Sequence, residues 1–389
     1  MVLFLHNRYR TTGGEERVLE DLMWLVREHL GEHAEALTRS SSTLSRGSAA
    51  AGLLRGGLNP REVAQAVRLG GARVVHAHNL QPGFGWRALA AARAAGARVV
   101  LHLHQYRLVC AIGVCYTRGA ECTRCHGRRT LPGVRLNCRG AVGEAIAYGA
   151  SLALWQRRLV AQADAVIVPS AFARERLREL GAPLPWERVH VIAPPLRALD
   201  DQPPQRAAAT ASQPAGGDRY ALVVARLAPE KGIEVAIEAC RRVGIPLVVA
   251  GGGPEHESLR RRADEGEGEV RIAGHVTERE LARLRSGAAI AVVPSLSAET
   301  FGLAAAEAMA SGLPVAASRV GALPELLEED ALAPPGDSEA LAQAIARQLA
   351  DPRAGERARE RVHAMCAPPR IARRLAAVYE GAGAQPAGT

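Results

Sequence analysis

Short apolar runs alternate along this chain with longer stretches whose apolar positions recur every three or four residues. The first case is the run Val2–His6, which leads through Gly13 and Gly14 into Glu15–Leu30, where positions 18, 19, 22, 23, 25 and 26 are apolar. An apolar run, a glycine turn and a 3.6-residue period predict a strand, a turn and a helix.

The same alternation recurs in both halves of the chain. For the first half it predicts strand Ala72–Ala77, helix Ala88–Ala95, strand Arg98–His102, strand Ala165–Val168, helix Ala171–Leu180 and strand Val189–Ile192. For the second half it predicts strand Tyr220–Ala225, helix Ile233–Val243, strand Pro246–Ala250, helix Glu255–Asp264, strand Val270–Ala273, helix Glu278–Ser286, strand Ala289–Val293, helix Phe301–Ala310 and strand Pro314–Ala317. Repeated strand–helix units predict an α/β protein with parallel sheets covered by helices on both faces.

A Pro-, Gly- and Ala-rich stretch divides these two halves. It has almost no large apolar side chain from Asp200 to Gly217, which is typical of an exposed linker. We therefore expect two doubly wound domains that face each other, with the ligand at the carboxyl ends of the strands. The expected organisation is an N-terminal domain 1–195 with a cysteine-rich loop 105–140, a linker 196–218, a C-terminal domain 219–365, and a helix and tail 366–389 that pack back on the N-terminal domain.

Composition agrees with a globular protein of about two domains. The 389 residues are 48% hydrophobic with 39 Gly, which excludes a disordered, collagen-like or coiled-coil chain. Residues 1–195 hold 26 basic and 14 acidic side chains (+12) and residues 196–389 hold 23 and 26 (−3), which sum to the net charge of +9. A basic first half suits an anionic membrane surface or a phosphorylated acceptor, although arginines that merely solvate the surface remain an alternative.

Two further classes are disfavoured by the sequence. With 14 aromatic residues, the chain lacks the interleaved basic and aromatic pattern of a nucleic-acid-binding surface. No stretch approaches the roughly 18–20 uninterrupted apolar residues of a spanning helix, and the opening segment is too polar for a signal peptide. We expect a cytoplasmic protein, and a peripheral association with the inner membrane face stays open.

Lysine is nearly absent. Of the 49 basic residues, every one except Lys231 is arginine. Lys231 and Arg226 lie five residues apart in the turn that follows the strand Tyr220–Ala225, just before a predicted helix. Two cations beside a helix N-terminus can neutralise a diphosphate as it leaves.

Two glutamates frame the start of a later helix. Glu299 lies in the loop after the strand Ala289–Val293, and Glu307 lies in the second turn of the helix predicted to start near Phe301. The free amides of the first turn suit a phosphate, and the carboxylates can accept hydrogen bonds from vicinal sugar hydroxyls. Because the helix around Glu307 is otherwise apolar, its charge is expected to need a partner.

These segments together resemble a known family. The sequences VARLAPEKG and ETFGLAAAEAMASGLPVAAS are similar to the C-terminal domain of family 4 glycosyltransferases, which are retaining enzymes of GT-B fold that use nucleotide-sugar donors. The similarity extends to AGGGPE, AGHVTERELARL, PSAFARERL and the opening HNRYRTTGGEE, and covers most of the chain. The resemblance implies a hexosyltransferase (EC 2.4) acting from a UDP- or GDP-sugar on a hydroxyl acceptor, which could be a polysaccharide, a lipid-linked sugar or a small glycoside.

The resemblance also implies roles for individual residues of the second domain. Arg226 and Lys231 would bind the donor diphosphate, and Glu307 would bind the ribose. The transferred sugar and distal phosphate would be held by Glu299 and the backbone amides of Phe301, Gly302 and Leu303. The base would contact His275 and Val276.

In the first domain the resemblance implies two further contacts. Gly13 and Gly14 would approach the phosphates closely because glycine has no side chain. His104 would position substrate near the sugar and acceptor, and a strand-end histidine bonded to backbone is the alternative. The catalytic set would thus be His104, Arg226, Lys231 and Glu299. We expect front-face attack without a divalent metal, since no Asp-X-Asp motif lies in either loop and the two cations stabilise the leaving group.

Cysteines cluster in the first half. Five of the seven lie within 29 residues, including a Cys-X-X-Cys motif, and they are Cys110, Cys115, Cys122, Cys125 and Cys138. Such a cluster is compatible with a structural zinc ion, with disulfides or with free thiols. No cofactor is expected for catalysis.

Other functions stay open at this point. A GT-B nucleotide-sugar epimerase would use the same donor site, whereas a phosphorylase would need a pyridoxal lysine that this chain does not offer outside the diphosphate loop. A non-catalytic basic module that binds a membrane or nucleic acid is the third alternative.

Overall fold

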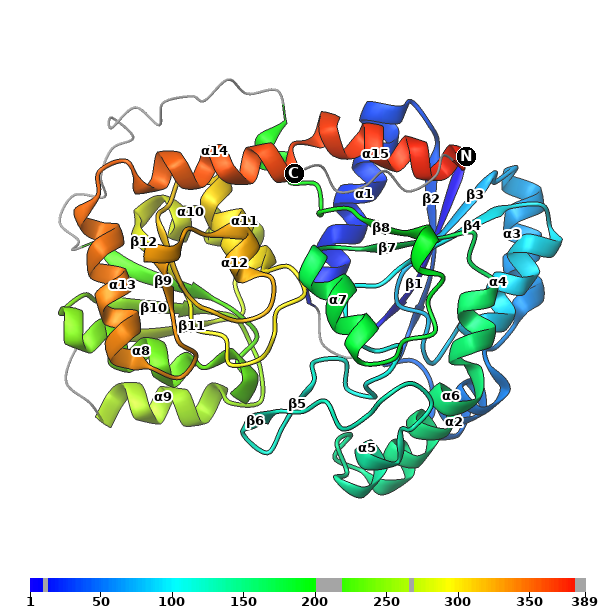
Figure 1. Ribbon diagram of the computed structural model, residues 1–389, viewed down its shortest axis with the longest axis horizontal. Helices are drawn as coiled ribbons and strands as arrows, with labels where there is room; N and C mark the ends of the chain where they lie inside the picture. Colours follow the sequence, from blue (N-terminus) through cyan, green and yellow to red (C-terminus); the bar gives the residue numbers. More distant parts are fainter. Residues whose placement is uncertain (10–12, 201–218, 266–268, 382–389) are drawn as a thin grey trace. The chain divides into compact units, whose positions relative to one another are not determined.

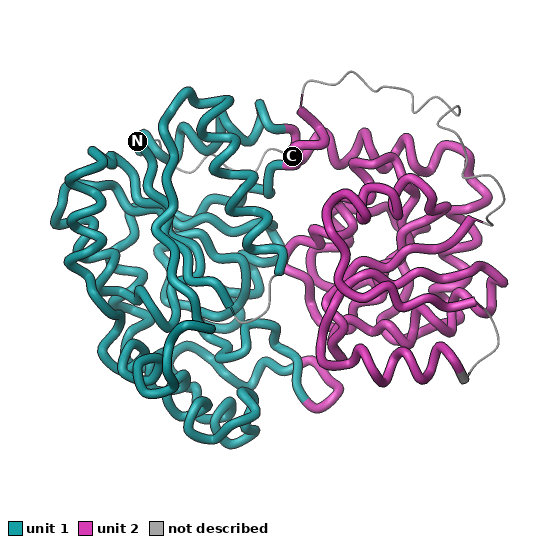
Figure 2. The backbone as a smooth tube through the Cα atoms, turned by 180° about the vertical axis from the view of Figure 1, so that it is seen from behind, with its two compact units in different colours: residues 1–117, 122–195, 368–389 teal, residues 118–121, 196–367 magenta. Residues whose placement is uncertain are grey.

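The computed structural model describes residues 1–9, 13–200, 219–265 and 269–381. The chain divides into two compact units (Figure 2), of which unit 1 comprises residues 1–117, 122–195 and 368–389 and unit 2 comprises residues 118–121 and 196–367. Most of the predicted linker (201–218) and the end of the predicted tail (382–389) lie outside the described residues.

Unit 1 is built on a parallel sheet with the strand order β2-β1-β3-β4-β7-β8 (Figure 1). Its strands are β1 (Val2–Arg8), β2 (Ala34–Ser40), β3 (Val74–Ala77), β4 (Arg98–His102), β7 (Ala165–Val168) and β8 (Val189–Val191). The central strands are buried along almost their whole length because helices cover both faces of a parallel sheet, and even their polar residues His6, Asn7 and His76 are fully buried.

The helices of unit 1 include one from the far end of the chain. They are α1 (Gly14–Leu30), α2 (Arg46–Arg55), α3 (Pro60–Gly70), α4 (Gly85–Ala94), α5 (Leu131–Arg135), α6 (Val142–Ala161), α7 (Ala171–Glu179) and α15 (Pro368–Glu380), with a short turn η1 (Trp186–Arg188). The loop region after β4 also contains β5 (Tyr116–Thr117) and β6 (Ala120–Glu121). Helix α15 packs against α1, and its Tyr379 hydroxyl lies 2.7 Å from Nδ1 of His76.

Unit 2 repeats the plan with a second parallel sheet, ordered β11-β10-β9-β12-β13-β14 (Figure 1). Its strands are β9 (Tyr220–Val224), β10 (Leu247–Ala250), β11 (Val270–Gly274), β12 (Ala288–Val293), β13 (Val315–Ser318) and β14 (Leu332–Ala333). Its helices are α8 (Ile233–Val243), α9 (His256–Glu265), α10 (Glu278–Gly287), α11 (Leu303–Ala310), α12 (Leu323–Leu326), α13 (Ser338–Ala350) and α14 (Ala354–Cys366), with short turns η2 (Arg197–Leu199), η3 (Pro229–Lys231) and η4 (Glu329–Ala331). In each sheet the first strand has sequence neighbours on both sides: β1 lies between β2 and β3, and β9 lies between β10 and β12. The strand order therefore changes direction at the first strand, as in doubly wound folds.

The structure differs from the sequence prediction at two functional boundaries. Helix α11 begins at Leu303 rather than near Phe301, because Gly302 adopts a left-handed conformation with φ of 97° that a helix cannot include. The first residues of the predicted linker are packed, since Leu196 and Leu199 are buried and η2 contacts α11. None of the described helices is both long and apolar enough to cross a membrane.

Candidate functional site

The centre of the candidate site in unit 2 is an ion pair between two loops. Lys231 ends the turn η3 after β9, and its Nζ donates to Oε1 of Glu299, 2.6 Å away, in the loop after β12. Ser295 donates a second hydrogen bond of 2.6 Å to the same oxygen. Burial disfavours the charged form of Glu299, but the Lys231 ammonium and these hydrogen bonds outweigh it and hold the pKa of the carboxyl below its ordinary value.

Arg226 belongs to the same pair of loops. Its guanidinium forms an ion pair with the buried carboxylate of Glu230, while the Arg226 side chain itself stays 43% exposed. The backbone carbonyl of Glu230 accepts hydrogen bonds from the amides of Leu296 and Ser297, at 2.8 and 3.2 Å. The β9 loop and the β12 loop are therefore held together by backbone bonds, and Arg226, Lys231 and Glu299 meet at the carboxyl ends of adjacent strands.

Two glycines allow this close approach. Gly232, with φ of 62°, follows Lys231, and a Cβ atom there would lie 2.2 Å from the carbonyl oxygen of Pro294. Gly302 precedes α11, and a Cβ atom there would lie 2.6 Å from Cδ2 of Leu323. Both positions combine a left-handed backbone with close packing, so only glycine fits without strain.

Helix α11 presents its N-terminus next to Glu299. No side chain caps this terminus, so the first amides, including that of Leu303, are available as donors in the described structure. Glu307, in the second turn, forms an ion pair with Arg285 of α10, and both side chains are more than four-fifths buried. Arg285 is thus the partner that the apolar surroundings of Glu307 require, and no sequence motif indicates it.

His275 and Val276 lie farther along the sheet. They follow β11, which is separated from β9 by β10. His275 is exposed and Val276 is half-buried, and they precede the N-cap Thr277 of α10. The structure places them at the same edge of the sheet as Lys231, two strands away.

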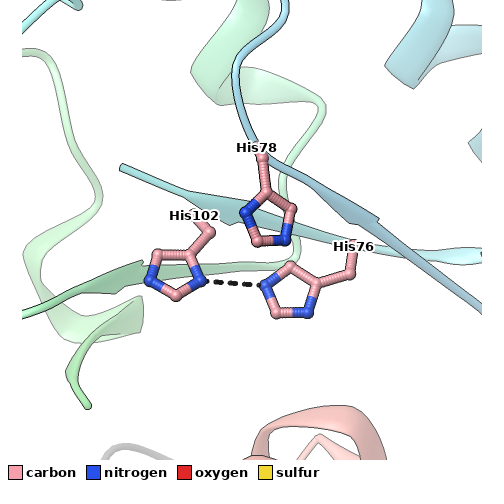
Figure 3. A group of neighbouring side chains, drawn as sticks. All are labelled: His76, His78 and His102. Atoms are coloured by element: carbon pink, nitrogen blue, oxygen red, sulfur yellow. Dashed lines mark hydrogen bonds between the residues drawn. The ribbon is translucent and has the colours of Figure 1, made fainter. Parts of the chain in front are cut away.

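In unit 1 the predicted residue His104 belongs to a group of four histidines. Nδ1 of His78 lies 2.7 Å from Nε2 of His104, and Nε2 of His76 lies 3.1 Å from Nδ1 of His102, the contact drawn in Figure 3. Residues two apart on a strand point to the same face, so His76 and His78 run alongside His102 and His104. The rings of the two pairs stack, with centroids 4.7 Å apart for His76 and His78 and 4.2 Å for His102 and His104.

Burial makes these imidazoles neutral. It lowers the pKa of His76 to about 3, with a further contribution from His104, and it lowers the pKa of His78, His102 and His104 well below the ordinary value. Ligand nitrogens of His76, His78 and His102 lie within 4.8 Å of one another, close enough for a metal ion. The contacts between His76 and His102 and between His78 and His104 join these rings in hydrogen-bonded pairs, so we interpret the group as a network that orients His104.

Gly13 and Gly14 lie at the start of α1. The amide of Gly13 donates to Oε2 of Glu16, 2.9 Å away, in a capping box, and Oε1 of Glu16 lies 3.5 Å from Nε2 of His6. The Gly13 amide is therefore already paired in this structure. Gly14 is the first residue of α1, and the next residue, Glu15, lines a cavity within unit 1.

That cavity is open to solvent, spans about 750 Å³ and is lined by residues of unit 1 alone. His78, His102 and His104 contribute to its wall, as do Glu15 and Arg107. Glu15 and Arg107 were not predicted as site residues: Glu15 lies in the quoted segment HNRYRTTGGEE, where only the glycines were assigned a role, and Arg107 is 92 positions away in the sequence. The adjacent acidic pair at the start of α1 was the available signal.

The five clustered cysteines surround a second, smaller cavity of about 370 Å³. All seven cysteines of the chain are free thiols. A hydrogen bond from Cys115 lowers the pKa of the Cys110 thiol to about 6 against the effect of burial, and the same bond together with burial raises the pKa of Cys115. Among the residues that the structure describes, these cysteines form no group of three that is already placed to hold a metal ion.

Comparison with known families matches both halves of the chain. Residues 205–364 match the family described as glycosyl transferases group 1, and residues 12–195 match the glycosyl transferase 4-like domain.

Curated relatives align over part of the chain. The amylovoran biosynthesis glycosyltransferase AmsK of Erwinia amylovora is 38% identical over 32% of this chain and 35% of its own length. A glycogen synthase of Mycobacterium tuberculosis is 34% identical over 51% of this chain and 49% of its own length. A GDP-mannose-dependent phosphatidylinositol dimannoside mannosyltransferase of the same species is 32% identical over 44% and 45%. The chain thus spans about a third to a half of the length of these curated relatives.

Solved structures share the fold over nearly the whole chain. Sucrose-phosphate synthase from Thermosynechococcus elongatus superposes with a TM-score of 0.68 at 23% identity, covering 98% of both chains. Anabaena Alr3699/HepE in complex with UDP superposes with a TM-score of 0.65 at 18% identity, covering 98% of this chain and all of that one. The predicted fold class, GT-B with two doubly wound parallel-sheet domains, is confirmed.

Proposed function

We propose that this chain, which belongs to the group 1 glycosyltransferases and begins with a family 4-like domain, moves a hexose from a nucleotide-diphosphate sugar to a hydroxyl acceptor with retention of configuration. The observation that carries the proposal is the contact between Lys231 and Glu299 beside the uncapped start of α11. It gathers a cation, a carboxylate and free amides at one edge of a sheet, which suits a sugar diphosphate.

Each of these groups has a defined task in the transfer. Lys231 and Arg226 stabilise the negative charge that develops on the departing diphosphate. Glu299 accepts hydrogen bonds from the transferred hexose, and Glu307 accepts them from the ribose. Because Arg226 and Lys231 each already face a carboxylate, the loop carries little net charge before the donor binds, and the anionic donor replaces these internal contacts.

The step we propose is a front-face displacement. The bond from C1 of the hexose to the phosphate oxygen breaks, and the diphosphate leaves with the electron pair. The acceptor oxygen forms its bond to C1 on the same face, and its proton passes to the leaving phosphate. The cations act on the charge of the transition state and need no divalent metal for this role.

The proposal is tested by supplying UDP- and GDP-hexoses with a panel of hydroxyl acceptors and following nucleotide release and the anomeric configuration of the product. The relatives named above support both donor classes, since one structure contains UDP and one relative is GDP-mannose-dependent. We expect an α-linked product from an α-linked donor. Glu307→Ala should weaken donor turnover strongly while the fold is kept.

The outcomes separate the competing functions. Isomerised free nucleotide sugar without a glycoside product would indicate the epimerase. No consumption of any donor, together with no thermal stabilisation by UDP or GDP, would contradict a nucleotide-sugar enzyme, because a ligand that binds the folded state raises the melting temperature.

We also propose a structural zinc ion in the cysteine-rich loop. Cys110, Cys115, Cys122, Cys125 and Cys138 surround one cavity, and thiolate sulfur is a preferred zinc ligand. Binding would draw the sulfurs together, since in a tetrahedral site they lie roughly 3.8 Å apart. Metal analysis of the purified protein should give one zinc per chain. Absence of zinc with every thiol titratable would contradict the proposal.

We propose an anionic membrane surface as a partner in addition to the donor and the acceptor. The excess of basic over acidic residues in the first half supports it, with 26 against 14. Co-sedimentation with vesicles of phosphatidylglycerol should exceed that with phosphatidylcholine and should weaken as salt is added. Equal sedimentation with both lipids would contradict it.

A further inference from the structure

The cavity of unit 1 joins segments that are far apart in the sequence. Its wall contains Tyr9, which directly follows β1, Glu15 of α1, the loops after β3 and β4, and residues of α2, α4 and α6. Helix α6 contributes Leu152 and Trp155, so the segment between β4 and β7 completes the cavity. None of the residues predicted for donor binding in unit 2 lines it.

One part of the wall carries buried polar atoms that have no partner. Oε2 of Glu15, Nε2 of His78 and Nε of Arg107 are all buried and make no hydrogen bond within the described chain. Glu15 is 9% exposed and His78 is 3% exposed, so water reaches them poorly. Leaving such atoms unpaired costs about 1–3 kcal/mol each, which a ligand able both to donate and to accept hydrogen bonds would remove.

The surroundings of these atoms are fixed. The guanidinium of Arg107 lies 4.3 Å above the ring of Tyr9, whose hydroxyl donates to Oδ1 of Asn79 over 2.6 Å. Gln105 hydrogen-bonds to Glu15, and it also accepts from Arg107 over 2.9 Å. The unpaired atoms therefore belong to side chains that are already held in place.

Another part of the wall is aromatic and aliphatic. The rings of Trp86 and Trp155 lie 5.9 Å apart, and Leu53 and Leu152 are buried beside them. The indole nitrogen of Trp155 donates to the carbonyl oxygens of Leu53 and Leu54 at 3.1 Å, which fixes the ring. The guanidinium of Arg158 lies over both rings, 5.4 Å from the centroid of Trp86 and 5.2 Å from that of Trp155. Both tryptophans remain partly exposed, so the surface that Arg158 leaves uncovered is apolar and open to a ligand.

We propose that this cavity binds an amphiphilic glycoside as acceptor, with a hydroxyl-bearing sugar head at Glu15, His78 and Arg107 and an apolar aglycone against Trp86 and Trp155. The inference rests on the proposed function and narrows its acceptor class. A sugar hydroxyl donates to Glu15 and accepts from Arg107, which pairs both orphaned atoms at once. An oligosaccharide without an apolar tail would leave the exposed surface of the two tryptophans in water.

Charge at the head supports the same assignment. Burial raises the pKa of Glu15 to about 7, against the pull of Arg107, with Glu16 adding to the rise and His6 and Gln105 opposing it. Near neutral pH the carboxyl of Glu15 exists in both forms, so it can donate to or accept from a hydroxyl. A permanently anionic head would meet this carboxylate less favourably than a neutral sugar does.

The test measures binding without any nucleotide sugar, so that it does not depend on transfer. Isothermal titration calorimetry compares n-octyl β-D-glucopyranoside, kept below its micelle concentration, with methyl β-D-glucopyranoside, which has the same head. We expect saturable binding of the octyl glucoside at least tenfold tighter than that of the methyl glucoside. Equal affinities, or no saturable binding of the octyl compound, would overturn the proposal.

Matched variants locate the binding. Trp155→Ala should weaken octyl glucoside binding at least tenfold, whereas Trp186→Ala, a partly exposed tryptophan of the same unit that does not line the cavity, should leave it unchanged. Glu15→Gln should weaken octyl glucoside binding severalfold, because it changes the group proposed to contact the sugar head. Unaltered binding by Trp155→Ala would overturn the proposal even if the enzyme transfers sugar, whereas binding without transfer to any acceptor would count against the proposed function alone.

Discussion

In unit 2 the carboxylate of Glu299 accepts hydrogen bonds from Lys231 and Ser295, whereas in unit 1 one oxygen of Glu15 lies at a cavity wall without a partner. The consequences for the two carboxyl groups are opposite. The pKa of Glu299 is lowered by its partners, and the pKa of Glu15 is raised by burial. A carboxylate that is paired in the free protein is stable before the ligand binds, and it exchanges its protein partners for the ligand on binding. A buried carboxyl with an unpaired oxygen keeps a desolvation cost until a ligand forms hydrogen bonds to it.

Removing the cation of the paired site should have the largest effect. Lys231→Ala removes the ammonium that pairs with Glu299 and one of the two cations proposed to bind the donor diphosphate. We therefore expect kcat/KM to fall about 10²- to 10³-fold, as for the loss of one preorganised donor. Steady-state kinetics with the preferred donor measures this. The matched control is Arg242→Ala, which removes an exposed cation paired with Glu238 on the same unit. A loss below fivefold in Lys231→Ala would remove Lys231 from the site.

Replacing the carboxyl of Glu15, one oxygen of which is unpaired, should increase the stability of the fold. Burial raises the pKa of Glu15 from 4.5 to about 7 on folding, so the folded state binds this proton more tightly than the unfolded state, and burial of the carboxylate costs stability as pH rises from 4.5 to 7. Glu15→Gln should therefore stabilise the protein by on the order of 3 kcal/mol at pH 8 and by under about 1 kcal/mol at pH 5. Urea unfolding at the two pH values measures the difference.

Glu16, the neighbour of Glu15, provides the control for this gain of stability. Glu16 accepts from the Gly13 amide and lies near His6, and these contacts outweigh burial and lower the pKa of its carboxyl. Its charge contributes stability above pH 4.5 that is lost as pH falls, so Glu16→Gln should destabilise the protein at pH 8. The same sign in both variants would contradict the contrast between paired and unpaired carboxylates.

The paired site was the one that the sequence allowed us to predict. Lys231 and Glu299 each lie in a short segment of recognisable pattern, directly after an apolar strand, and the carboxyl ends of neighbouring parallel strands meet at one edge. The cavity of unit 1 could not be predicted in this way. Tyr9, Glu15 and Arg107 meet only because of the packing of separate elements, and nothing in the local sequence specifies their burial.

The fold shows the same division. Strands β4 and β7 and helix α8 have the predicted limits, because a continuous apolar run or a 3.6-residue period is a local property. Strand β2 was not predicted, since it is an edge strand whose residues are mostly exposed and therefore lack an apolar run.

Exchanging the single lysine for the cation that the chain uses everywhere else should have an intermediate effect. Lys231→Arg keeps the charge, but a planar guanidinium cannot reproduce the compact ammonium 2.6 Å from Glu299, so kcat/KM should fall on the order of 30-fold. Kinetics alongside Lys231→Ala measures the partial rescue. Full activity in Lys231→Arg would mean that charge alone is needed and that the pairing geometry is not.

The smallest effect should come from the second partner of Glu299. Ser295 is buried, and its hydroxyl donates over 2.6 Å to the oxygen that also faces Lys231. Ser295→Ala removes one of two donors while the ammonium stays, so kcat/KM should fall about fivefold, as expected for a hydrogen bond worth about 1 kcal/mol. Ser297→Ala is the matched control, because that buried serine contacts the other loop through its backbone amide. An equal loss in both variants would indicate a general loosening of the loop, whereas a loss confined to Ser295→Ala would show that the charge of Glu299 depends on each of its partners.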